Sequence, residues 1–419
     1  MIHGMFSTAS GGAFGPLGAV VAVFWEESLV NKFVKVLTYV AAVLLGSTLT
    51  MAYLLNRGIL GAPAADASKL DQLAAVIDEF FIEEPDMTAL EDAAASAMVT
   101  ATGDRWSYYI SAADYASYVE QSQNAYVGIG ITITANEEPA GFAVVEVTPG
   151  SPAEEAGLQV HDVLVEVEGQ NCAELGQDGT RNLVRGEEGT TVELVVNRDG
   201  QELAFTVERR QVQVPVATAT VLDSGYGLIT IANFEARCAD ETIAAIDALM
   251  AQGVEGIIFD VRFNPGGYKS ELVELLDYIL PEGPLFRSET YDGKTEVDNS
   301  DADHIEIPMA VLVNGDSYSA AEFFAAALQE YDYALVVGQQ TCGKGYFQNT
   351  IRLSDGSAVA LSTGKYYTPN GVSLAGVGIT PDLPVEVDED TYAAIYYGEV
   401  DPEEDPQIQA AISALAESP

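Results

Sequence analysis

The stretch VLVNGDSYSAAEFFAAALQEYDYALVVGQQTCGKGYFQ, residues 311–348, decides how the central part of the chain folds. An apolar run at residues 309–313 has the length and composition of a buried strand, and an Asn-Gly-Asp turn follows it. Ser319 then opens an alanine-rich segment whose apolar residues recur at helical spacing. A second apolar run, residues 334–337, ends in a glycine-bounded loop that carries Lys344. The pattern predicts a strand, a helix that begins at a serine, and a second strand followed by a lysine.

Further strands and helices are predicted to alternate on the N-terminal side of this unit. They are a strand at 227–231, a helix at 241–252, a strand at 256–261 and a helix at 270–279. Strands that alternate with helices in this way are typical of a layered α/β core. We therefore expect an α/β domain over residues 213–387.

A glycine turn with the sequence NPGG, residues 264–267, joins a predicted strand to a predicted helix. Gly266 and Gly267 would let backbone amides face a ligand there, and the start of a helix favours negative charge. An oxyanion hole requires this construction, and the amide of Ala320 could serve as its other donor. The alternative is a tight turn in which the glycines serve only the backbone angles.

The common hydrolase chemistries find little support in this domain. A serine–histidine–aspartate triad needs a histidine, and His304, in a polar and acidic loop, is the only one in residues 213–387. The chain contains no HExxH motif, so a zinc peptidase is unsupported. A lysine base remains.

Four lysines lie in the domain: Lys269, Lys294, Lys344 and Lys365. Lys344 lies between two glycines after a buried strand, so it can approach a closed site. Burial would lower its pKa and allow it to act as a base near neutral pH. We predict Ser319 as the nucleophile because it directly precedes the helix, and Ser317 as a turn residue.

Composition sets limits on partners and cofactors. The chain has 419 residues, enough for two or three domains, and 18 basic against 64 acidic residues give a formal net charge of −46. This balance argues against nucleic acid or an anionic membrane surface as a partner, since both require basic patches. The three cysteines lack metal-site spacing, and we expect neither a metal nor a cofactor.

The N-terminal region contains a membrane-spanning pattern. Residues 36–55 carry no charge, and about 20 apolar residues suffice to cross a bilayer as a helix. Lys32 and Lys35 precede this run and the chain soon becomes acidic after it, which predicts a cytoplasmic N-terminus. We expect a transmembrane signal anchor at 32–57 with the catalytic domain extracytoplasmic; a cleavable signal peptide is the alternative. The leader, residues 1–31, has no assigned role.

Residues 58–123 predict a linker followed by a small helical region. Apolar residues recur at helical spacing in residues 70–82 and 87–100. The segment GDRWSYYIS, residues 103–111, follows them. We place no chemistry on this region and expect it to serve packing or dimer contacts.

Residues 124–212 combine short strands with turns. A Pro-Gly-Ser-Pro turn places Ser151 to cap a short helix, and an Asn-Arg-Asp-Gly sequence predicts a hairpin. The order resembles a PDZ domain of the bacterial, circularly permuted kind, in which a peptide C-terminus adds as a strand and a glycine loop holds its carboxylate. The loop would be formed by Gly128, Ile129, Gly130 and Ile131.

Taken together, residues 70 to about 387 resemble the C-terminal processing, or tail-specific, serine peptidases. The motifs are GDRWSYYI, YVGIGI, SPAEEAGL, LVRGEEGTTVEL, IIFDVRFNPGG, VNGDSYSAAEFFAAAL, TCGKGYFQ and YYTPNGVSLAGVGITPDLPVEV. The resemblance implies an α/β multidomain fold: a crotonase-like serine peptidase core, an inserted PDZ domain and an N-terminal helical region.

The resemblance also implies roles for individual residues. Ser319 and Lys344, 25 residues apart, would form a Ser–Lys dyad, with Gln348 orienting the lysine. The oxyanion donors would be the amides of Ala320 and of Gly266 or Gly267. Arg185 would couple peptide binding to assembly of the active site.

We therefore expect a membrane-anchored serine endopeptidase that cleaves protein substrates from or near their C-termini. Its partners would be proteins or peptides with a free C-terminus, and self-association is left open, as is the role of the acidic tail, residues 388–419. One alternative is a catalytically idle, membrane-anchored PDZ scaffold, against which intact Ser319, Lys344 and Gln348 argue. A trypsin-like PDZ protease is a third and poorer alternative, because the histidine is missing.

Overall fold

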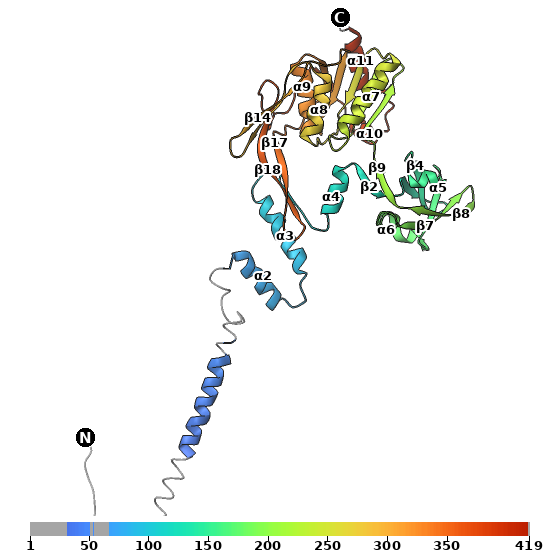
Figure 1. Cartoon of the computed structure of the whole chain (residues 1–419). Coiled ribbons are helices and arrows are strands. Elements are labelled where there is room, and N and C mark those ends of the chain that lie inside the picture. The colour runs from blue at the N-terminus through green and yellow to red at the C-terminus, as the bar shows by residue number, and fades with distance from the viewer. Residues whose placement is uncertain (1–31, 51–52, 54–66, 418–419) are drawn as a thin grey trace, which may run out of the picture. The chain divides into compact units, whose positions relative to one another are not determined.

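The computed structural model describes residues 32–50, 53 and 67–417, and these fall into two compact units that divide between Ala94 and Ala95 (Figure 1). The predicted leader, the end of the predicted anchor and most of the linker lie outside the described residues. The first unit contains a helix at Lys32–Thr50 that is long and apolar enough to cross a membrane, as a signal sequence can also be. It also contains α2 (Lys69–Phe80) and the start of α3 (Met87–Thr100).

A six-stranded sheet forms the centre of the second unit. Its order is β10 (Ala217–Val221), β11 (Gly227–Ile231), β12 (Ile257–Asp260), β15 (Met309–Val313), β16 (Ala334–Gly338) and β19 (Leu383–Pro384). Every neighbouring pair is parallel except β10 with β11. The apolar runs of β12 and β15 are buried along their whole length, as expected for parallel strands covered on both faces.

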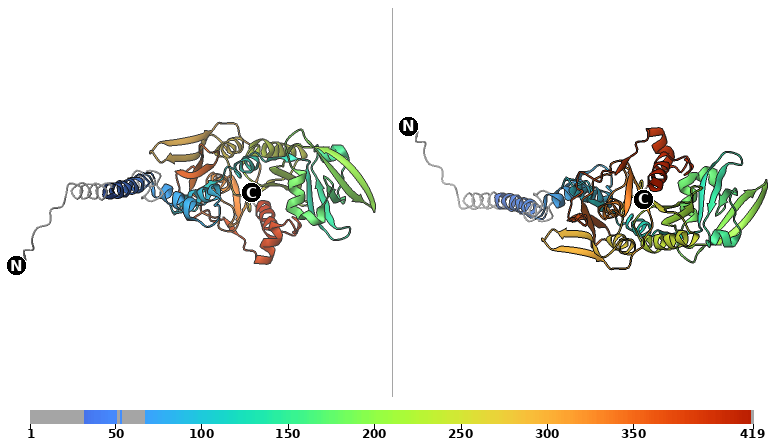
Figure 2. Two further views of the ribbon diagram at one scale, coloured as in Figure 1. Left: turned by 90° about the horizontal axis from the view of Figure 1, so that it is seen from below. Right: turned by 90° about the horizontal axis from the view of Figure 1, so that it is seen from above.

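Helices cover both faces of this sheet. Side chains of α7 (Cys238–Gln252), α8 (Lys269–Ile279) and α9 (Ala320–Glu330) pack with one set of alternating strand residues, including Phe259 and Val311. The C-terminal helix α11 (Pro406–Glu417) packs with the other set, including Ile258 and Leu312. Figure 2 shows α11, in red, on the side of the sheet opposite the yellow α7 and α8.

A second sheet lies beside this core and was not predicted. Its strands are β1 (Tyr108–Ile110), β18 (Ala358–Tyr367), β13 (Gly283–Thr290) and β14 (Thr295–Ser300) in that order, and β17 (Tyr346–Arg352) also pairs with β18. The loop that carries Lys344 leads directly into β17. This sheet therefore controls where the predicted base lies.

The region after α4 (Tyr115–Ser122) has a separate hydrophobic core. Its main sheet has the order β3 (Ile131–Asn136), β4 (Gly141–Val147), β5 (Val163–Val167), β7 (Thr191–Arg198) and β8 (Gln201–Glu208), with β6 (Gln170–Asn171) on β5; α5 (Pro152–Ala156) and α6 (Cys172–Val184) pack on it. The strands β2 (Ala125–Gly128) and β9 (Arg210–Gln213) pair at its two ends. Together these elements confirm the expected α/β multidomain fold.

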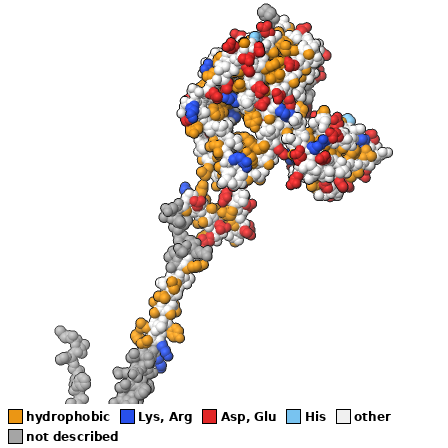
Figure 3. Space-filling model, in the orientation of Figure 1, with side chains coloured by type: hydrophobic (Ala, Val, Ile, Leu, Met, Phe, Trp, Pro, Cys, Tyr) orange, Lys and Arg blue, Asp and Glu red, His pale blue; other side chains and the backbone are white. Residues whose placement is uncertain are grey.

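The surface carries the charge that the composition predicts. Acidic side chains are spread over the visible face rather than gathered in one patch, and basic side chains are sparse between them (Figure 3). The helix α10 (Glu389–Tyr396), in the acidic tail, continues this pattern with Glu389 and Asp390 in its first turn.

Candidate active site

Ser319 lies where the turn after β15 enters α9. Its φ of 60° is rare for a residue with a side chain and costs about 1–3 kcal/mol, which is typical of strained functional positions. The side chain is largely buried, and its Oγ accepts a hydrogen bond of 3.1 Å from the hydroxyl of Tyr366 on β18. Ser317, in contrast, is fully buried and its Oγ donates to the carbonyl of Val261, as expected of a turn residue.

Gly266 packs directly against the nucleophile. A Cβ at this position would lie 2.6 Å from the Cβ of Ser319 and 2.7 Å from the amide nitrogen of Ala320, so only glycine fits. The Gly266 amide donates to Oδ1 of Asn264 at 2.8 Å, whereas the amide of Gly267 has no acceptor among the described residues. Of the two glycines predicted as oxyanion donors, Gly267 is thus the one with a free amide.

Lys344 faces two aromatic rings. Its Nζ lies 4.9 Å from the ring centre of Trp106 and 5.7 Å from that of Tyr318. Burial lowers the pKa of Lys344 to about 8, although the carboxylates of Glu322 and Asp104 act to raise it. A lysine with this pKa is neutral in about a tenth of the molecules at pH 7, against well under a thousandth for an ordinary lysine.

Glu322 connects the serine to the lysine loop. This fully buried carboxylate accepts hydrogen bonds from the amides of Ser319 (3.1 Å) and Lys344 (2.9 Å) at Oε2. At Oε1 it accepts from the hydroxyl of Thr341 (2.6 Å) and the amide of Gly343 (2.7 Å). Burial raises the pKa of Glu322 although these four hydrogen bonds oppose the shift. The backbone of the predicted base is therefore held beside the backbone of the predicted nucleophile.

Two predicted contacts are not made in this conformation. Among the described residues, no hydrogen bond joins the Oγ of Ser319 to the Nζ of Lys344. Gln348 follows a register shift in β17, and its Nε2 donates to Ser362 Oγ (2.9 Å) and to the carbonyl of Tyr346 (3.1 Å) rather than to the lysine. The dyad hydrogen bond and the orienting role of Gln348 stay predictions.

The GDRWS segment, on which we placed no chemistry, contributes to the site. Besides Trp106, it supplies Ser107, which donates to Asp104 at 2.5 Å and accepts from the amide of Ser362 at 3.0 Å. Burial acts to raise the pKa of Asp104, but hydrogen bonds from Ser107, Ser362 and Trp106 outweigh it and lower the pKa below its ordinary value. A charged carboxylate thus lies near Lys344. The signal available in the sequence was one of only two tryptophans in the chain, placed in an otherwise helical region.

Glu235 is a second acidic group that the sequence did not reveal. It follows Phe234, whose backbone pairs with Gly266 and Tyr268 on either side of Gly267. Its Oε2 is buried and has no hydrogen-bond partner among the described residues. Burial raises the pKa of Glu235 to about 7, and the neighbouring carboxylate of Glu271 adds to the shift.

The predicted carboxylate-binding loop faces a groove beside β3. The carbonyl of Ile129 accepts from the amide of Ala153 (2.8 Å), and the carbonyl of Gly130 accepts from Thr148 (3.0 Å). Carbonyl and amide point in opposite directions across a planar trans peptide unit, so the amides of Gly130 and Ile131 point away from these partners. They are available to an anion in the groove.

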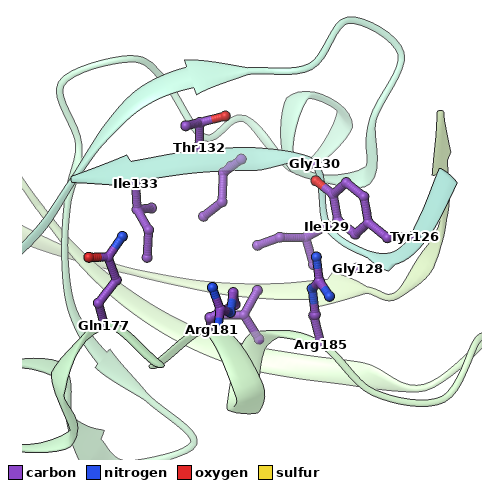
Figure 4. A pocket seen from close by; sticks show the side chains of 11 residues that line it. Tyr126, Gly128, Ile129, Gly130, Thr132, Ile133, Gln177, Arg181 and Arg185 are labelled. Carbon is purple, nitrogen blue, oxygen red and sulfur yellow. The ribbon is translucent and has the colours of Figure 1, made fainter. Parts of the chain in front are cut away.

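The groove has a volume of about 250 Å³, and Figure 4 shows the side chains that line it. One wall is the start of β3 and the other is α6. The guanidinium of Arg185, just after α6, lies 4.9 Å from the ring centre of Tyr126, and its stem is next to Gly128. A cation therefore lies at the end of the groove where a peptide carboxylate is expected.

The described residues contain no group of three or more His, Cys, Asp or Glu side chains arranged to hold a metal ion. Cys172, Cys238 and Cys342 are free thiols.

Comparison with known proteins identifies the family. Residues 225–385 match peptidase family S41, and residues 144–198 match the PDZ domain. The carboxy-terminal processing protease CtpA of Bacillus subtilis is 30% identical over 377 residues, which cover 88% of this chain and 79% of that protein. The chain belongs to peptidase family S41. The carboxyl-terminal-processing protease of Synechocystis is a further relative, 33% identical over 295 residues, 69% of this chain and 68% of that protein.

A solved structure shows the same fold for this S41 peptidase. The putative S41 protease of Bacteroides fragilis is 17% identical, with a TM-score of 0.51 over 84% of this chain and 98% of that one. The S41 match spans both Ser319 and Lys344. The protein is a serine peptidase with a PDZ domain, which confirms the family and the enzyme class expected from its motifs.

Proposed function

We propose that this S41 peptidase is a membrane-anchored endopeptidase that cuts protein substrates from or near their C-termini, with Ser319 as nucleophile and Lys344 as general base. The groove beside β3 would first bind the free C-terminus of the substrate. The observation that carries the proposal is the carboxylate of Glu322, which accepts hydrogen bonds from the amides of both Ser319 and Lys344.

The reaction would proceed through an acyl-enzyme. Neutral Lys344 takes the proton of Ser319 as its Oγ attacks the substrate carbonyl carbon, and the amides of Ala320 and Gly267 stabilise the oxyanion. Lys344 then gives the proton to the leaving amine as the C–N bond breaks. Water then attacks the ester carbonyl carbon while Lys344 takes a proton from the water. The bond to the Oγ of Ser319 breaks, Lys344 returns the proton to this oxygen, and the new C-terminus leaves.

We infer that the described conformation precedes this chemistry. The hydroxyl of Tyr366 holds the Oγ of Ser319, and the ammonium of Lys344 faces Trp106 and Tyr318. Tyr366 is not a candidate base. Burial raises its pKa above its ordinary value, so the phenol keeps its proton, and a protonated phenol cannot take the proton of the serine. The side chain of Lys344 must therefore turn toward Ser319 before attack.

The helix Lys32–Thr50 supports a single-pass anchor in the cell membrane, with the peptidase outside the cytoplasm. Carbonate extraction of membranes tests the anchor, and N-terminal sequencing of the mature protein separates an anchor from a cleaved signal. Recovery of a soluble protein that begins after residue 57 would contradict the anchor. Self-association and the role of Arg185 in coupling the PDZ domain to the active site stay predictions.

Digestion of β-casein tests the catalytic assignment. The full chain should degrade it, whereas Ser319→Ala and Lys344→Ala should not, while both retain binding of a C-terminal peptide. A protein that binds such peptides but leaves β-casein intact at every pH would be the idle PDZ scaffold. Amidation of the C-terminus of a peptide substrate should raise KM with little effect on kcat. An unchanged KM would exclude the predicted carboxylate-binding role of the loop at residues 128–131.

A further inference from the structure

The peptide groove concentrates positive charge in a chain that has little of it. The whole sequence holds 18 basic and 64 acidic residues, yet Arg181 and Arg185 both line this one groove and, among the described residues, no acidic side chain does. The carboxylate of a bound peptide accounts for one cation, which is Arg185 beside Gly128. Arg181 remains without a role in the proposed binding of a C-terminus.

The geometry of strand addition defines where a bound tail must lie. In the described sheet β3 is an end strand that pairs only with β4, so its other edge is open to a peptide. A tail with its carboxylate at Gly130 would run antiparallel to β3. Its side chains would alternate between the two faces, so the last residue and the third from last would both point toward α6.

The helical wall presents three residues to these two side chains. Gln177, Arg181 and Val184 follow one another at a spacing of four and three residues, so they share one face of α6. Figure 4 shows Gln177, Arg181 and Arg185 in order along this wall. Arg181 therefore lies between the carboxylate end and the Gln177 end of the groove.

The two positions of the tail meet different surroundings. Next to the carboxylate, Val184 and Ile131 offer apolar contacts, which suit an apolar C-terminal residue. Two residues earlier, about 7 Å further along the strand, the tail reaches Ile133 and Gln177. Arg181 lies one helical turn from Val184 and one from Gln177, so its long side chain would be within reach of both positions.

Arg181 is available for a ligand. Its ion-pair partner is Asp178, at 2.7 Å, and the two side chains are 55% and 83% exposed. An exposed ion pair of this kind contributes little. A carboxylate held in the groove is shielded from water on more sides and can accept two parallel hydrogen bonds from the guanidinium.

We propose that Arg181 makes the groove selective for tails in which an aspartate or glutamate stands two residues before an apolar C-terminal residue. The proposal rests on the proposed binding of a free C-terminus to the PDZ domain, and it names the class of substrate that binds. The acidic side chain pairs with Arg181 while the terminal carboxylate binds the Gly130 and Ile131 amides beside Arg185.

Fluorescence polarisation with labelled eight-residue peptides tests this on the full chain in detergent, with Ser319→Ala to prevent turnover. The peptides end in Asp-Ala-Leu, Asn-Ala-Leu or Lys-Ala-Leu, each as free acid and as amide. We expect the Asp tail to bind about tenfold more tightly than the Lys tail, with Asn between them. Arg181→Glu should reverse this order. Arg210→Glu makes the same change in net charge outside the groove and should keep it.

Results that contradict only the acidic selectivity can be distinguished from results that contradict the proposed PDZ function. Equal binding of the three acids, or an unchanged order in Arg181→Glu, overturns the acidic selectivity and leaves the PDZ function intact as long as amidation weakens every peptide. Equal binding of acids and amides, or no binding at all, overturns the proposed PDZ function and the selectivity with it. Tight binding of the Lys tail by Arg181→Glu also shows that this variant folds.

Discussion

The backbone amides of Ser319 and Lys344 donate to the same atom, Oε2 of Glu322, at 3.1 and 2.9 Å. The two predicted catalytic residues are 25 positions apart in sequence, and one carboxylate makes their backbones neighbours. We expect the long side chain of Lys344 to reach the serine by rotation about its own bonds. Glu322 thus binds the backbones of both, and we expect it to act as a positioning residue.

Replacement of Glu322 by glutamine should separate these two backbones. The side-chain NH₂ group that Glu322→Gln introduces would present a donor where backbone donors already meet, and a buried donor left unpaired costs about 1–3 kcal/mol. We expect kcat to fall at least tenfold, with a lower Tm. The control is Glu241→Gln on α7, where the carboxylate also accepts backbone amides, from Val216 and Ala217, but lies outside the site. It should lower Tm and leave kcat unchanged; equal loss of kcat in both variants would show a general effect of stability.

The activity should rise with pH. Lys344 acts as a base only when neutral, and burial lowers its pKa to about 8, so kcat/KM should increase through the range around pH 8 and then level off. A pH profile of peptide cleavage measures this. A rise centred near the ordinary lysine pKa of about 10.4 would mean that the active enzyme exposes Lys344 to water.

The stability of the fold should also depend on the protonation state of Lys344. The pKa of Lys344 is lower in the folded chain than in the unfolded chain, so the charged lysine destabilises the fold at neutral pH, and this cost diminishes as pH rises above about 8. Lys344→Met should therefore be inactive yet have a higher Tm than the wild type at pH 7. Thermal unfolding at pH 7 and at about pH 10 should show the difference shrinking; a constant difference would point to packing rather than charge.

Removal of the Tyr366 hydroxyl should make Ser319 more reactive. The phenol donates to Oγ and so draws electron density from the nucleophile. Because a hydrogen bond of this kind contributes about 0.5–1.5 kcal/mol, we expect Tyr366→Phe to react about two- to tenfold faster with a fluorophosphonate. Tyr367→Phe is the matched control, since the adjacent hydroxyl donates to Glu289 instead. Slower labelling of Tyr366→Phe would show that this phenol supports attack.

Trp106 should set the pKa of the base. Its ring covers the Nζ of Lys344, so Trp106→Ala would admit water and move the pKa of the lysine upward, toward its ordinary value. The pH profile of cleavage should shift upward, whereas Trp106→Phe, which retains a ring, should shift it less. Identical profiles for the two variants would assign the burial of Lys344 to other residues, with Tyr318 as the first to examine.

The strand and helix around Ser319 could be predicted from the sequence because local pattern and tertiary burial agree there. The apolar run Met309–Val313 matches β15 residue for residue, since parallel strands covered on both faces contain almost no polar residues. The second sheet was missed because several of its strands, such as β14 and β17, are largely exposed and polar. Strand β17, with the sequence YFQNTIR, shows no apolar run, and β1 pairs with β18, which is about 250 residues away along the chain.

The site could be predicted only as far as single residues reveal their chemistry. Ser319 and Lys344 stand out by their place before a helix and between glycines. Apart from the contact between Glu322 and Ser319, three positions apart, the contacts that bring Glu322, Trp106 and Tyr366 to the site join residues that lie between 19 and 238 positions apart, so their local sequence does not reveal them. Gln348, assigned from a resemblance alone, makes different contacts in this conformation.

The φ of 60° at Ser319 has a consequence for how inactive forms of this enzyme are made. Alanine at position 319 would remove the hydroxyl and keep the unfavourable backbone angle, whereas glycine would remove both, since a residue without Cβ adopts this angle freely. Ser319→Gly should therefore tolerate more heat than Ser319→Ala. The difference between their Tm values would measure how much stability the protein loses by holding its nucleophile at this backbone angle.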